Sequence, residues 1–389
     1  MNRDAGKDIA IHLYPTQLTH EVRIFRVTRS LTACNVFRRI VVIGSRQGSE
    51  LRCVKRLDSR RYLVRMPTVI SRAGLASKIL NFVEWNIRVI FFSLNYQPGC
   101  VNAHSLSSLP AAVAIKLLKR CSLIYEPHEI ETETTETKGL RKLVSKFVER
   151  SLVKFVDKML LTSRGHEEWY RRAFPTMSMF TTRNCPYWAQ KGHPREEDSN
   201  IRAVLNLDGT DRLFLYHGAI SFPRGVMTVA RAFMRVRPSQ HILFMGFGSA
   251  VDEIKEYARE NRNIHYLPAV PPERVRFHAE QADVGIHMMD DSCVNHLYAL
   301  PNKPMEYMNA GLAVIVSDVP EMAQLIIEAR TGYTVPVGDE VALAELVDSL
   351  ADTDLSTQRE NARAWSMMNN WENEELKLLD FYRDLGGKF

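Results

Sequence analysis

The sequence lacks any run of the ~20 apolar residues that a transmembrane helix needs, and none of its six cysteines stand in C-x-x-C spacing. The polar start, residues 1–8, is followed by an apolar run at 9–14 that is too short for the core of a signal peptide. These absences argue against a membrane-spanning or secreted protein and against a metal held by cysteines. We therefore expect a cytoplasmic protein with reduced thiols.

Strong net charge and low-complexity tracts are also absent. The 51 Lys and Arg against 45 Asp and Glu leave a net charge of +6, and no basic stripe is interleaved with aromatic residues, so we expect no nucleic-acid partner. Hydrophobic residues make up 45% of the 389 residues, which is ordinary for globular proteins. At this length the chain is expected to form two or three domains with sizeable cores.

In the first half of the chain, short apolar runs alternate with longer amphipathic ones. The runs of strand length are 9–13, 40–43, 89–94, 122–125 and 158–161, and the amphipathic segments are 21–32, 106–119, 139–155 and 165–174. Strands that alternate with helices predict a parallel sheet covered by helices on both faces.

The alternation stops at residues 183–210, whose polar stretch is typical of a linker. It restarts with strands expected at 212–216, 241–245, 264–267, 284–288, 312–316 and 333–337, and with helices between them and at 339–350. We predict an α/β fold of two Rossmann-like, doubly wound domains that face an interdomain cleft. The predicted boundaries are a first domain at 1–190, a linker at 191–210, a second domain at 211–362, and a C-terminal helix at 363–389 that packs back on the body.

Loops suited to phosphate follow three strands of the predicted second domain. The first carries Gly218 and Arg224, the second Gly246 and Gly248, and the third opens a short helix with Asn302, Lys303 and Glu306. Glycines let the backbone approach a phosphate closely, helix N-termini favour anions, and arginine offers a forked donor. Because the carboxyl ends of parallel strands share one edge of a sheet, we expect these loops to converge on one crevice.

These residues also carry a family resemblance. The pattern comprises Gly218 to Gly225, Gly246 and Gly248, Ala282-Asp283-Val284, Pro301 to Tyr307, Ala310-Gly311 and Gly332. It resembles the donor-binding half of the family-four-like glycosyltransferases (glycosyl transferases group 1), which have the GT-B fold. In the first domain the loops at 20–23, 101–105 and 125–129 look like that family's acceptor-side loops, so the likeness runs from about residue 8 to about residue 350.

The resemblance implies a role for each candidate residue at the donor. A nucleotide sugar would lie in the cleft, with its diphosphate neutralised by Arg224 and Lys303 and its ribose hydroxyls bound by Glu306. A carboxylate suits two adjacent hydroxyls because it accepts hydrogen bonds from both. Gly218, Gly246, Gly248 and Asn302 complete the expected donor site. No metal or other cofactor is implied, and Asp290-Asp291 has no further oxygen ligands nearby in the sequence.

The resemblance implies that Arg23 lies on the acceptor side and that His104 contacts a sugar hydroxyl or a phosphate. Glu126, His128 and Glu129 follow a buried run, and together they form a candidate group for orienting the acceptor or accepting its proton. A hydrated loop without a catalytic role is the alternative for these three residues. A structural role at a strand end is the alternative for His104.

Two positions depart from the family's pattern. Tyr298 stands eight residues before Glu306, where the family usually has a second glutamate, and Ala219 stands where it usually has an arginine after the first glycine. The chain thus looks like a Pro-Asn-Lys variant that lacks the first glutamate of the pair. The donor sugar must then be contacted by other groups, among which Asn302, His296 and backbone amides are the candidates.

The segment 139–159 is a basic, amphipathic helix in pattern. We expect its apolar stripe to pack on the core and its basic face to contact an anionic membrane that presents a lipid-linked acceptor.

The sequence therefore predicts a GT-B glycosyltransferase in the cytoplasm, at the inner face of the membrane. It would transfer a sugar from a nucleoside-diphosphate donor to a glycan or lipid-linked acceptor, with retention of configuration, in bacterial surface polysaccharide assembly (capsule, O-antigen or exopolysaccharide). Two alternatives remain open: a catalytically silent GT-B protein that serves as a binding or scaffold subunit, and a nucleotide-sugar 2-epimerase.

Overall fold

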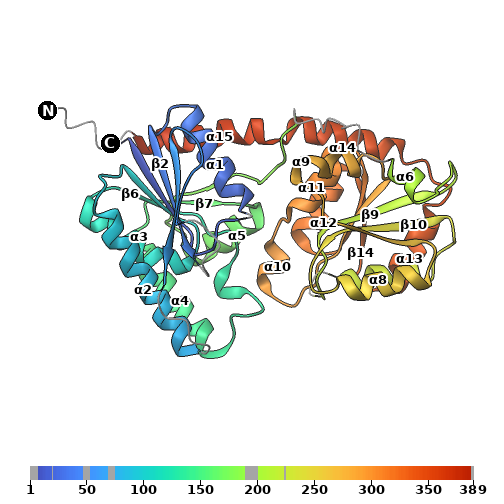
Figure 1. Ribbon diagram of the computed structural model, residues 1–389, viewed down its shortest axis with the longest axis horizontal. Helices are drawn as coiled ribbons and strands as arrows, with labels where there is room; N and C mark the ends of the chain where they lie inside the picture. Colours follow the sequence, from blue (N-terminus) through green and yellow to red (C-terminus); the bar gives the residue numbers. More distant parts are fainter. Residues whose placement is uncertain are drawn as a thin grey trace. The chain divides into compact units, whose positions relative to one another are not determined.

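The computed structural model describes residues 8–19, 21–46, 53–68, 75–188, 200–222 and 225–386 (Figure 1). His20 and Arg224 lie outside these ranges. The chain divides into two units, of which the first comprises Met1–Arg183 and Glu374–Phe389 and the second Asn184–Asn373.

The first unit is built on an eight-stranded sheet in the order β3-β4-β2-β1-β5-β6-β7-β8. Its strands are β1 (Ile9–Leu13), β2 (Arg39–Arg46), β3 (Val54–Arg56), β4 (Arg61–Pro67), β5 (Cys100–Ala103), β6 (Ser122–Tyr125), β7 (Lys158–Leu161) and β8 (Met179–Thr181). All pairings are parallel except that of β3 with β4. The central strands are buried along most of their length, as expected for a parallel sheet covered on both faces.

Five helices of this unit come from the segment before residue 184. They are α1 (Val22–Ala33), α2 (Leu75–Ser93), α3 (Leu109–Lys119), α4 (Gly139–Val153) and α5 (Arg164–Ala173). Helices α2, α3 and α4 lie on one side of the sheet and α1 on the other (Figure 1). The strand predicted at 89–94 is wrong, because this apolar run is the last part of α2. A short apolar run fits a buried strand and one face of a helix equally well.

Much of the apolar stripe of helix α4 faces solvent, contrary to the prediction. Leu140, Leu143, Val144 and Phe147 are exposed, whereas Glu149 and Val153 are buried. The prediction that this stripe packs on the core is therefore wrong for these four residues. The buried Glu149 accepts hydrogen bonds from two buried tyrosines of the unit, and this polar contact sets which face of the helix turns inward.

The second unit is built on a six-stranded sheet in the order β11-β10-β9-β12-β13-β14, with every pairing parallel. Its strands are β9 (Arg212–Ala219), β10 (Gln240–Phe247), β11 (Ile264–Pro268), β12 (Val284–His287), β13 (Ala313–Ser317) and β14 (Gly332–Val335). After β9, the chain adds β10 and β11 on one side of β9 and then β12, β13 and β14 on its other side. In such sheets, ligands bind outside the carboxyl ends of the strands at this reversal.

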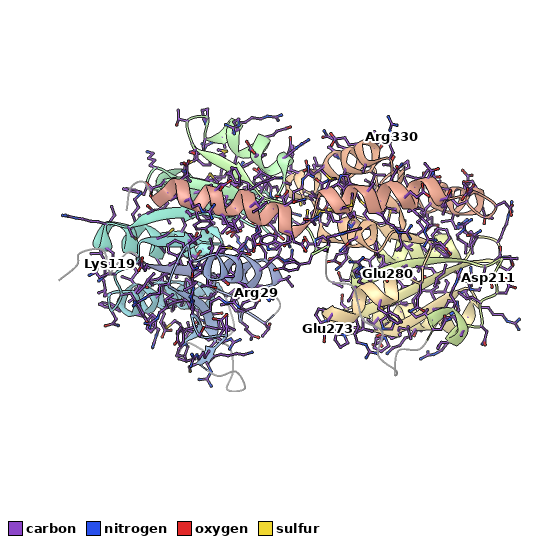
Figure 2. All side chains as sticks on the ribbon, turned by 90° about the horizontal axis from the view of Figure 1, so that it is seen from above. Arg29, Lys119, Asp211, Glu273, Glu280 and Arg330 are labelled. Carbon is purple, nitrogen blue, oxygen red and sulfur yellow. The ribbon has the colours of Figure 1, made fainter. Side chains whose placement is uncertain are left out.

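Two layers of apolar side chains cover the faces of the second sheet. One face packs against α7 (Val226–Phe233), α8 (Val251–Glu260) and α13 (Glu340–Ser349). The other packs against α9 (Pro272–Ala279), α11 (Asn302–Asn309), α12 (Pro320–Ala329) and α14 (Ser356–Met368). Two short helices, α6 (Ile201–Val204) and α10 (Val294–Tyr298), complete this unit. Charged side chains such as Arg330, at the end of α12, point outward (Figure 2).

The C-terminal part consists of α14 and α15 (Trp371–Gly386). Trp371 packs near Tyr187 in the second unit, while the residues of α15 from Glu374 onward belong to the first. There Tyr382 is buried against Phe37. The six cysteines are free thiols. Within the ranges given above, no helix has the length and apolarity needed to cross a membrane.

Candidate functional site

In the second unit, the carboxyl ends of β9 and β10 meet the start of α11. Gly218 has a φ of +105°, and a Cβ at this position would lie 2.5 Å from the Cε of Lys303. A Cβ at Gly246 would lie 1.9 Å from the carbonyl oxygen of Gly218. Both positions therefore need glycine for the two strand ends and the lysine to approach each other. The structure thus brings together Gly218, Gly246 and Lys303 at one edge of the sheet.

Lys303 and Glu306 form the charged part of this group. The Nζ of Lys303 lies 2.9 Å from Oε2 of Glu306, and Nε2 of His217 lies 3.4 Å from the same oxygen. His217 is buried, and burial together with the nearby lysine lowers the pKa of its imidazole to about 3. The imidazole is therefore neutral near pH 7, and the cation of this site belongs to Lys303.

Tyr307 fixes α11 against the strands. Its buried hydroxyl accepts a hydrogen bond from the backbone N–H of His217 (3.0 Å) and donates one to the carbonyl oxygen of Ile286 (3.1 Å). These bonds tie the helix to β9 and β12, so the positions of Lys303 and Glu306 follow from the sheet. Neither His217 nor Tyr307 stood among the predicted site residues, although both directly adjoin predicted ones in the sequence.

The remaining donor-side residues have different surroundings. Gly248 follows the end of β10, and the oxygen of the Asn302 side chain accepts a hydrogen bond from Asn184 (3.0 Å). Among the candidates for the missing sugar contact, His296 of α10 is engaged by Asp290. Arg224 lies outside the described residues.

In the first unit, four of the predicted residues meet at the carboxyl ends of β5 and β6. The buried Arg23 of α1 donates through Nε to Oε1 of Glu126 at 2.6 Å, and its other nitrogens donate to Thr182. Nδ1 of His104 lies 3.3 Å from Oε2 of Glu126 and 3.2 Å from Nε2 of His128. Glu129, the fifth predicted residue, is exposed.

A chain of buried polar side chains extends behind His104. Its Nε2 lies 2.8 Å from Nδ1 of His12, and Nε2 of His12 lies 3.3 Å from the amide nitrogen of Asn102. Tyr382 of α15 donates to the oxygen of that amide at 2.7 Å. None of these three supporting residues is among the predicted site residues. A polar residue in the middle of a buried run, as His12 is in β1, was the available signal.

Burial controls the ionisation of this cluster. It lowers the pKa of His104 to about 3 and that of His128 to about 3, with neighbouring charged and imidazole groups adding to the effect. Burial also raises the pKa of Tyr14, whose ring centroid lies 5.2 Å from that of His128, well above its ordinary value. At neutral pH the imidazoles of His104 and His128 and the phenol of Tyr14 are therefore uncharged.

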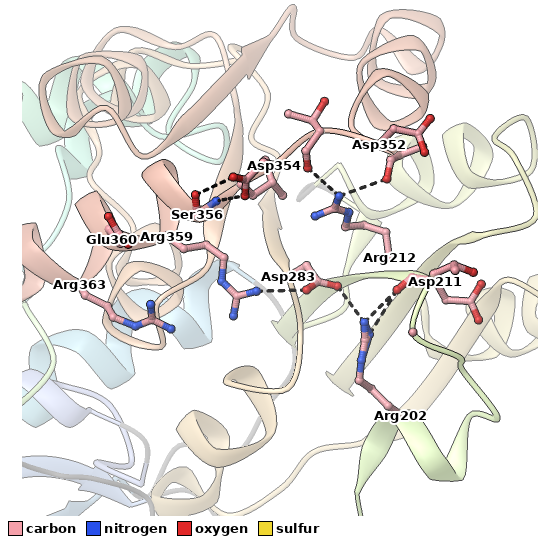
Figure 3. A pocket seen from close by; sticks show the side chains of 15 residues that line it. Arg202, Asp211, Arg212, Asp283, Asp352, Asp354, Ser356, Arg359, Glu360 and Arg363 are labelled. Carbon is pink, nitrogen blue, oxygen red and sulfur yellow. Dashed lines mark hydrogen bonds and ion pairs between the residues drawn. The ribbon is translucent and has the colours of Figure 1, made fainter.

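A pocket of about 700 Å³ lies elsewhere in the second unit, at the amino ends of its strands (Figure 3). Asp283, just before β12, pairs with Arg202 (3.1 Å) and Arg359 (3.2 Å) and accepts a hydrogen bond from the N–H of Leu213 (2.9 Å). Ligands of open α/β sheets bind at the opposite, carboxyl edge. The charges of Asp283, Arg202 and Arg359 are matched within the protein, and we assign these three residues a structural role.

Comparison with known families gives a match within the second unit. Residues 211–353 match the family described as "Glycosyl transferases group 1". The predicted group 1 domain is therefore confirmed for this part of the chain. The "Probable glycosyltransferase WbjE" of Pseudomonas aeruginosa is 25% identical over 151 residues, which are 38% of this chain. The aligned part covers only 37% of that relative's length.

Solved structures match over nearly the whole chain. Sucrose-phosphate synthase from Thermosynechococcus elongatus has a TM-score of 0.80 at 15% identity, covering 98% of this chain and 100% of its own. HepE of Anabaena, solved with UDP-glucose, has a TM-score of 0.71 at 13% identity, covering 97% and 99%. WaaG, described as a glycosyltransferase involved in lipopolysaccharide biosynthesis, has a TM-score of 0.66 at 14% identity, covering 96% and 99%. The predicted GT-B fold is confirmed.

Proposed function

We propose that this protein, whose second unit carries a glycosyl transferases group 1 domain, is a glycosyltransferase that uses a nucleoside-diphosphate sugar. The observation that carries the proposal is the group formed by Gly218, Lys303 and Glu306. It combines a close backbone approach, a cation and a carboxylate at the carboxyl edge of the sheet. This edge is where open α/β sheets bind nucleotides.

Each part of the donor has a partner in this group. The diphosphate would lie over Gly218 and near the N-terminus of α11, where Lys303 neutralises the charge that develops on the leaving group. Glu306 would accept hydrogen bonds from the ribose hydroxyls. Arg224 would supply a second cation at the diphosphate. With these groups the donor site requires no metal ion to neutralise the diphosphate.

The cluster of Arg23, His104, Glu126 and His128 is the proposed acceptor side. Its carboxylate and imidazoles lie within 4.0 Å of one another, and His128 is partly exposed, so a hydroxyl of an acceptor would find both donors and acceptors there. Glu129 would contribute from the exposed part of the same loop.

A membrane is the proposed location of the acceptor. The exposed stripe of α4 includes Leu140 and Phe147, with exposed fractions of 75% and 71%, and Arg141 and Arg150 are exposed beside it. Helix α2 adds a second exposed stripe, made of Ile79, Leu80, Val83, Ile87 and Phe91. Both helices pack on α3. Apolar stripes flanked by arginines suit an anionic membrane surface.

We further propose transfer to a glycan or lipid-linked acceptor in bacterial surface polysaccharide assembly, with retention of configuration, at the inner face of the cell membrane. WaaG, which shares the fold, is described as acting in lipopolysaccharide biosynthesis, and this supports the choice of pathway. The exposed apolar stripes support an acceptor carried by a lipid.

The proposal is tested by screening UDP, GDP, ADP and CMP sugars for thermal stabilisation of the purified protein, followed by measurement of nucleotide release. A ligand that binds only the native state raises its apparent stability. K303A and E306Q are expected to weaken binding of the stabilising nucleotide by about 10-fold or more, equivalent to about 1.4 kcal/mol. K255A, which breaks the exposed Lys255 and Asp252 pair of α8, serves as the matched control.

Unchanged donor binding and turnover in both K303A and E306Q would contradict the proposed site. Donor binding without any nucleotide release, in the presence of membrane extracts as acceptor, would instead identify a binding protein.

A further inference from the structure

Three side chains with metal-ligating atoms meet at the carboxyl ends of β5 and β6. They are His104, Glu126 and His128, and one ligand atom from each lies within 4.8 Å of the others. His104 directly follows β5 and Glu126 directly follows β6, so the sheet itself sets their spacing. The sequence does not reveal this group, because His104 is separated from the other two residues by more than twenty positions.

Two of the three separations match those of ligands around a single ion. Nδ1 of His104 lies 3.2 Å from Nε2 of His128 and 3.3 Å from Oε2 of Glu126. A tetrahedral ion with bonds of about 2.0–2.1 Å holds neighbouring ligand atoms roughly 3.3 Å apart. Nε2 of His128 lies 4.0 Å from the nearer carboxylate oxygen of Glu126, so a bound ion would draw the partly exposed His128 towards Glu126.

One oxygen of this group lacks a hydrogen bond. Glu126 is fully buried, and its Oε1 is held by Arg23, but its Oε2 forms no hydrogen bond with any part of the chain that the structure describes. A buried carboxylate oxygen without a partner costs free energy. A bond from Oε2 to a metal ion would satisfy it, and Oε2 is the oxygen that lies near His104.

The surroundings orient the ligands as metal sites require. Nε2 of His104 lies 2.8 Å from Nδ1 of His12, and this contact orients the imidazole of His104. Arg23 fixes the carboxylate of Glu126 from behind.

We propose that His104, Glu126 and His128 form a binding site for a divalent transition-metal ion of the zinc type. Two imidazoles and one carboxylate suit Zn²⁺ better than Mg²⁺ or Ca²⁺, which prefer sets of oxygen ligands. Three protein ligands leave a fourth position open, as in zinc sites that bind a further molecule. His128 is partly exposed, so it gives an ion a route from solvent. The ligands are residues of the proposed acceptor side, but metal binding is tested by itself, without any assumption about the reaction.

The test measures metal binding on the full-length protein without a histidine tag. After treatment with a chelator and dialysis, the protein is titrated with Zn²⁺ by calorimetry and with Co²⁺ by visible absorption. We expect one equivalent of either ion and cobalt bands of a four-coordinate site. H128N is expected to weaken Zn²⁺ binding by more than about 100-fold. Loss of a side chain that only hydrogen-bonds to a metal ligand already costs about 10–100-fold in affinity, and His128 is proposed as a ligand itself.

H265N is the matched control, because His241 and His265 form another close pair of imidazoles, 3.0 Å apart, in the second unit. It is expected to keep the high-affinity equivalent, and Zn²⁺ should raise the melting temperature of the wild type and H265N but not of H128N. If H128N fails to fold, H104N and the cobalt spectrum of the wild type decide the question. Absence of a bound equivalent in the wild type, or equal Zn²⁺ affinity in the wild type and the folded histidine variant, would overturn the proposal and leave a purely hydrogen-bonded cluster.

Discussion

The side chain of Lys303 lies over the backbone of Gly218, so closely that a Cβ on residue 218 would come within 2.5 Å of the lysine Cε. The same lysine lies 2.9 Å from the carboxylate of Glu306, one turn further along α11. A glycine at the end of β9 therefore determines where the cation of the proposed donor site stands. The φ of +105° at Gly218 adds a second reason for glycine, because other residues rarely adopt this conformation.

We predict that G218A weakens nucleotide binding while the protein remains folded. The new methyl group displaces Lys303, and the strained backbone costs about 1–3 kcal/mol of stability. The dissociation constant of the stabilising nucleotide should rise about 10-fold or more, as measured by calorimetry on folded protein. G209A is the control, because no atom lies within 4 Å of a Cβ at that position. Equal nucleotide affinity in G218A and G209A would contradict the proposed position of the diphosphate.

Most of the fold could be predicted from the sequence because hydrophobic periodicity repeats from strand to strand. Every strand expected in the second unit is present, and the parallel order follows from the helices between them. The periodicity failed where the local signal was ambiguous. The run at 89–94 belongs to a helix whose Trp85 and Val89 are buried on one face, and no local feature separates such a face from a strand.

The candidate sites were predicted only in part, because supporting contacts join distant segments. Lys303 and Glu306 stand in one short motif, whereas the buried tyrosine hydroxyl that positions them acts through β9 and β12. In the first unit, His12 and Tyr382 lie 370 residues apart in the sequence (382 − 12) and are linked through Asn102. Such partners can be found only after the strands are placed side by side.

The exposed stripe on α4 leads to a prediction about vesicle binding. Replacing Phe147 by Ser removes a large apolar side chain that is 71% exposed. We expect F147S to reduce the fraction of protein that sediments with vesicles containing anionic lipid about 5-fold or more, without lowering the melting temperature, because burial of apolar area in the interface contributes to binding. I327S is the control, since Ile327 is a comparably exposed apolar residue of α12. Equal sedimentation of the two variants would argue against α4 as the membrane contact.

The ion pairs of Asp283 give a prediction about stability alone. D283A leaves Arg202 and Arg359 without this carboxylate and removes the acceptor of the Leu213 N–H. We expect a loss of about 2–3 kcal/mol in the free energy of unfolding, somewhat less than for fully buried pairs. Nucleotide affinity should not change, because Asp283 stands at the amino ends of the strands. D352A removes an exposed partner of Arg237 and should change stability by less than about 1 kcal/mol. An equal loss of nucleotide affinity in D283A and K303A would contradict the proposed position of the nucleotide at the carboxyl ends of the strands.

The buried carboxylate of Glu149 predicts a pH dependence of stability. Its Oε1 accepts hydrogen bonds from Tyr125 (3.0 Å) and Tyr170 (3.1 Å), and burial raises the pKa of the carboxyl from 4.5 to about 7. The folded state therefore holds a proton on Glu149 at pH values where the unfolded chain has lost it. Stability falls with rising pH wherever the folded state binds more protons, so this group destabilises the protein progressively between about pH 4.5 and pH 7.

The E149Q variant isolates this effect because an amide oxygen still accepts from the tyrosines but does not ionise. Near pH 5 the variant and the wild type should have similar free energies of unfolding in urea. At pH 8 the variant should be more stable by about 3 kcal/mol, since each unit of pKa shift corresponds to about 1.4 kcal/mol. E345Q, at an exposed glutamate of α13, controls for the loss of a negative charge. A difference between E149Q and the wild type that stays constant from pH 5 to pH 8 would mean that Glu149 keeps the same ionisation in the folded and unfolded states.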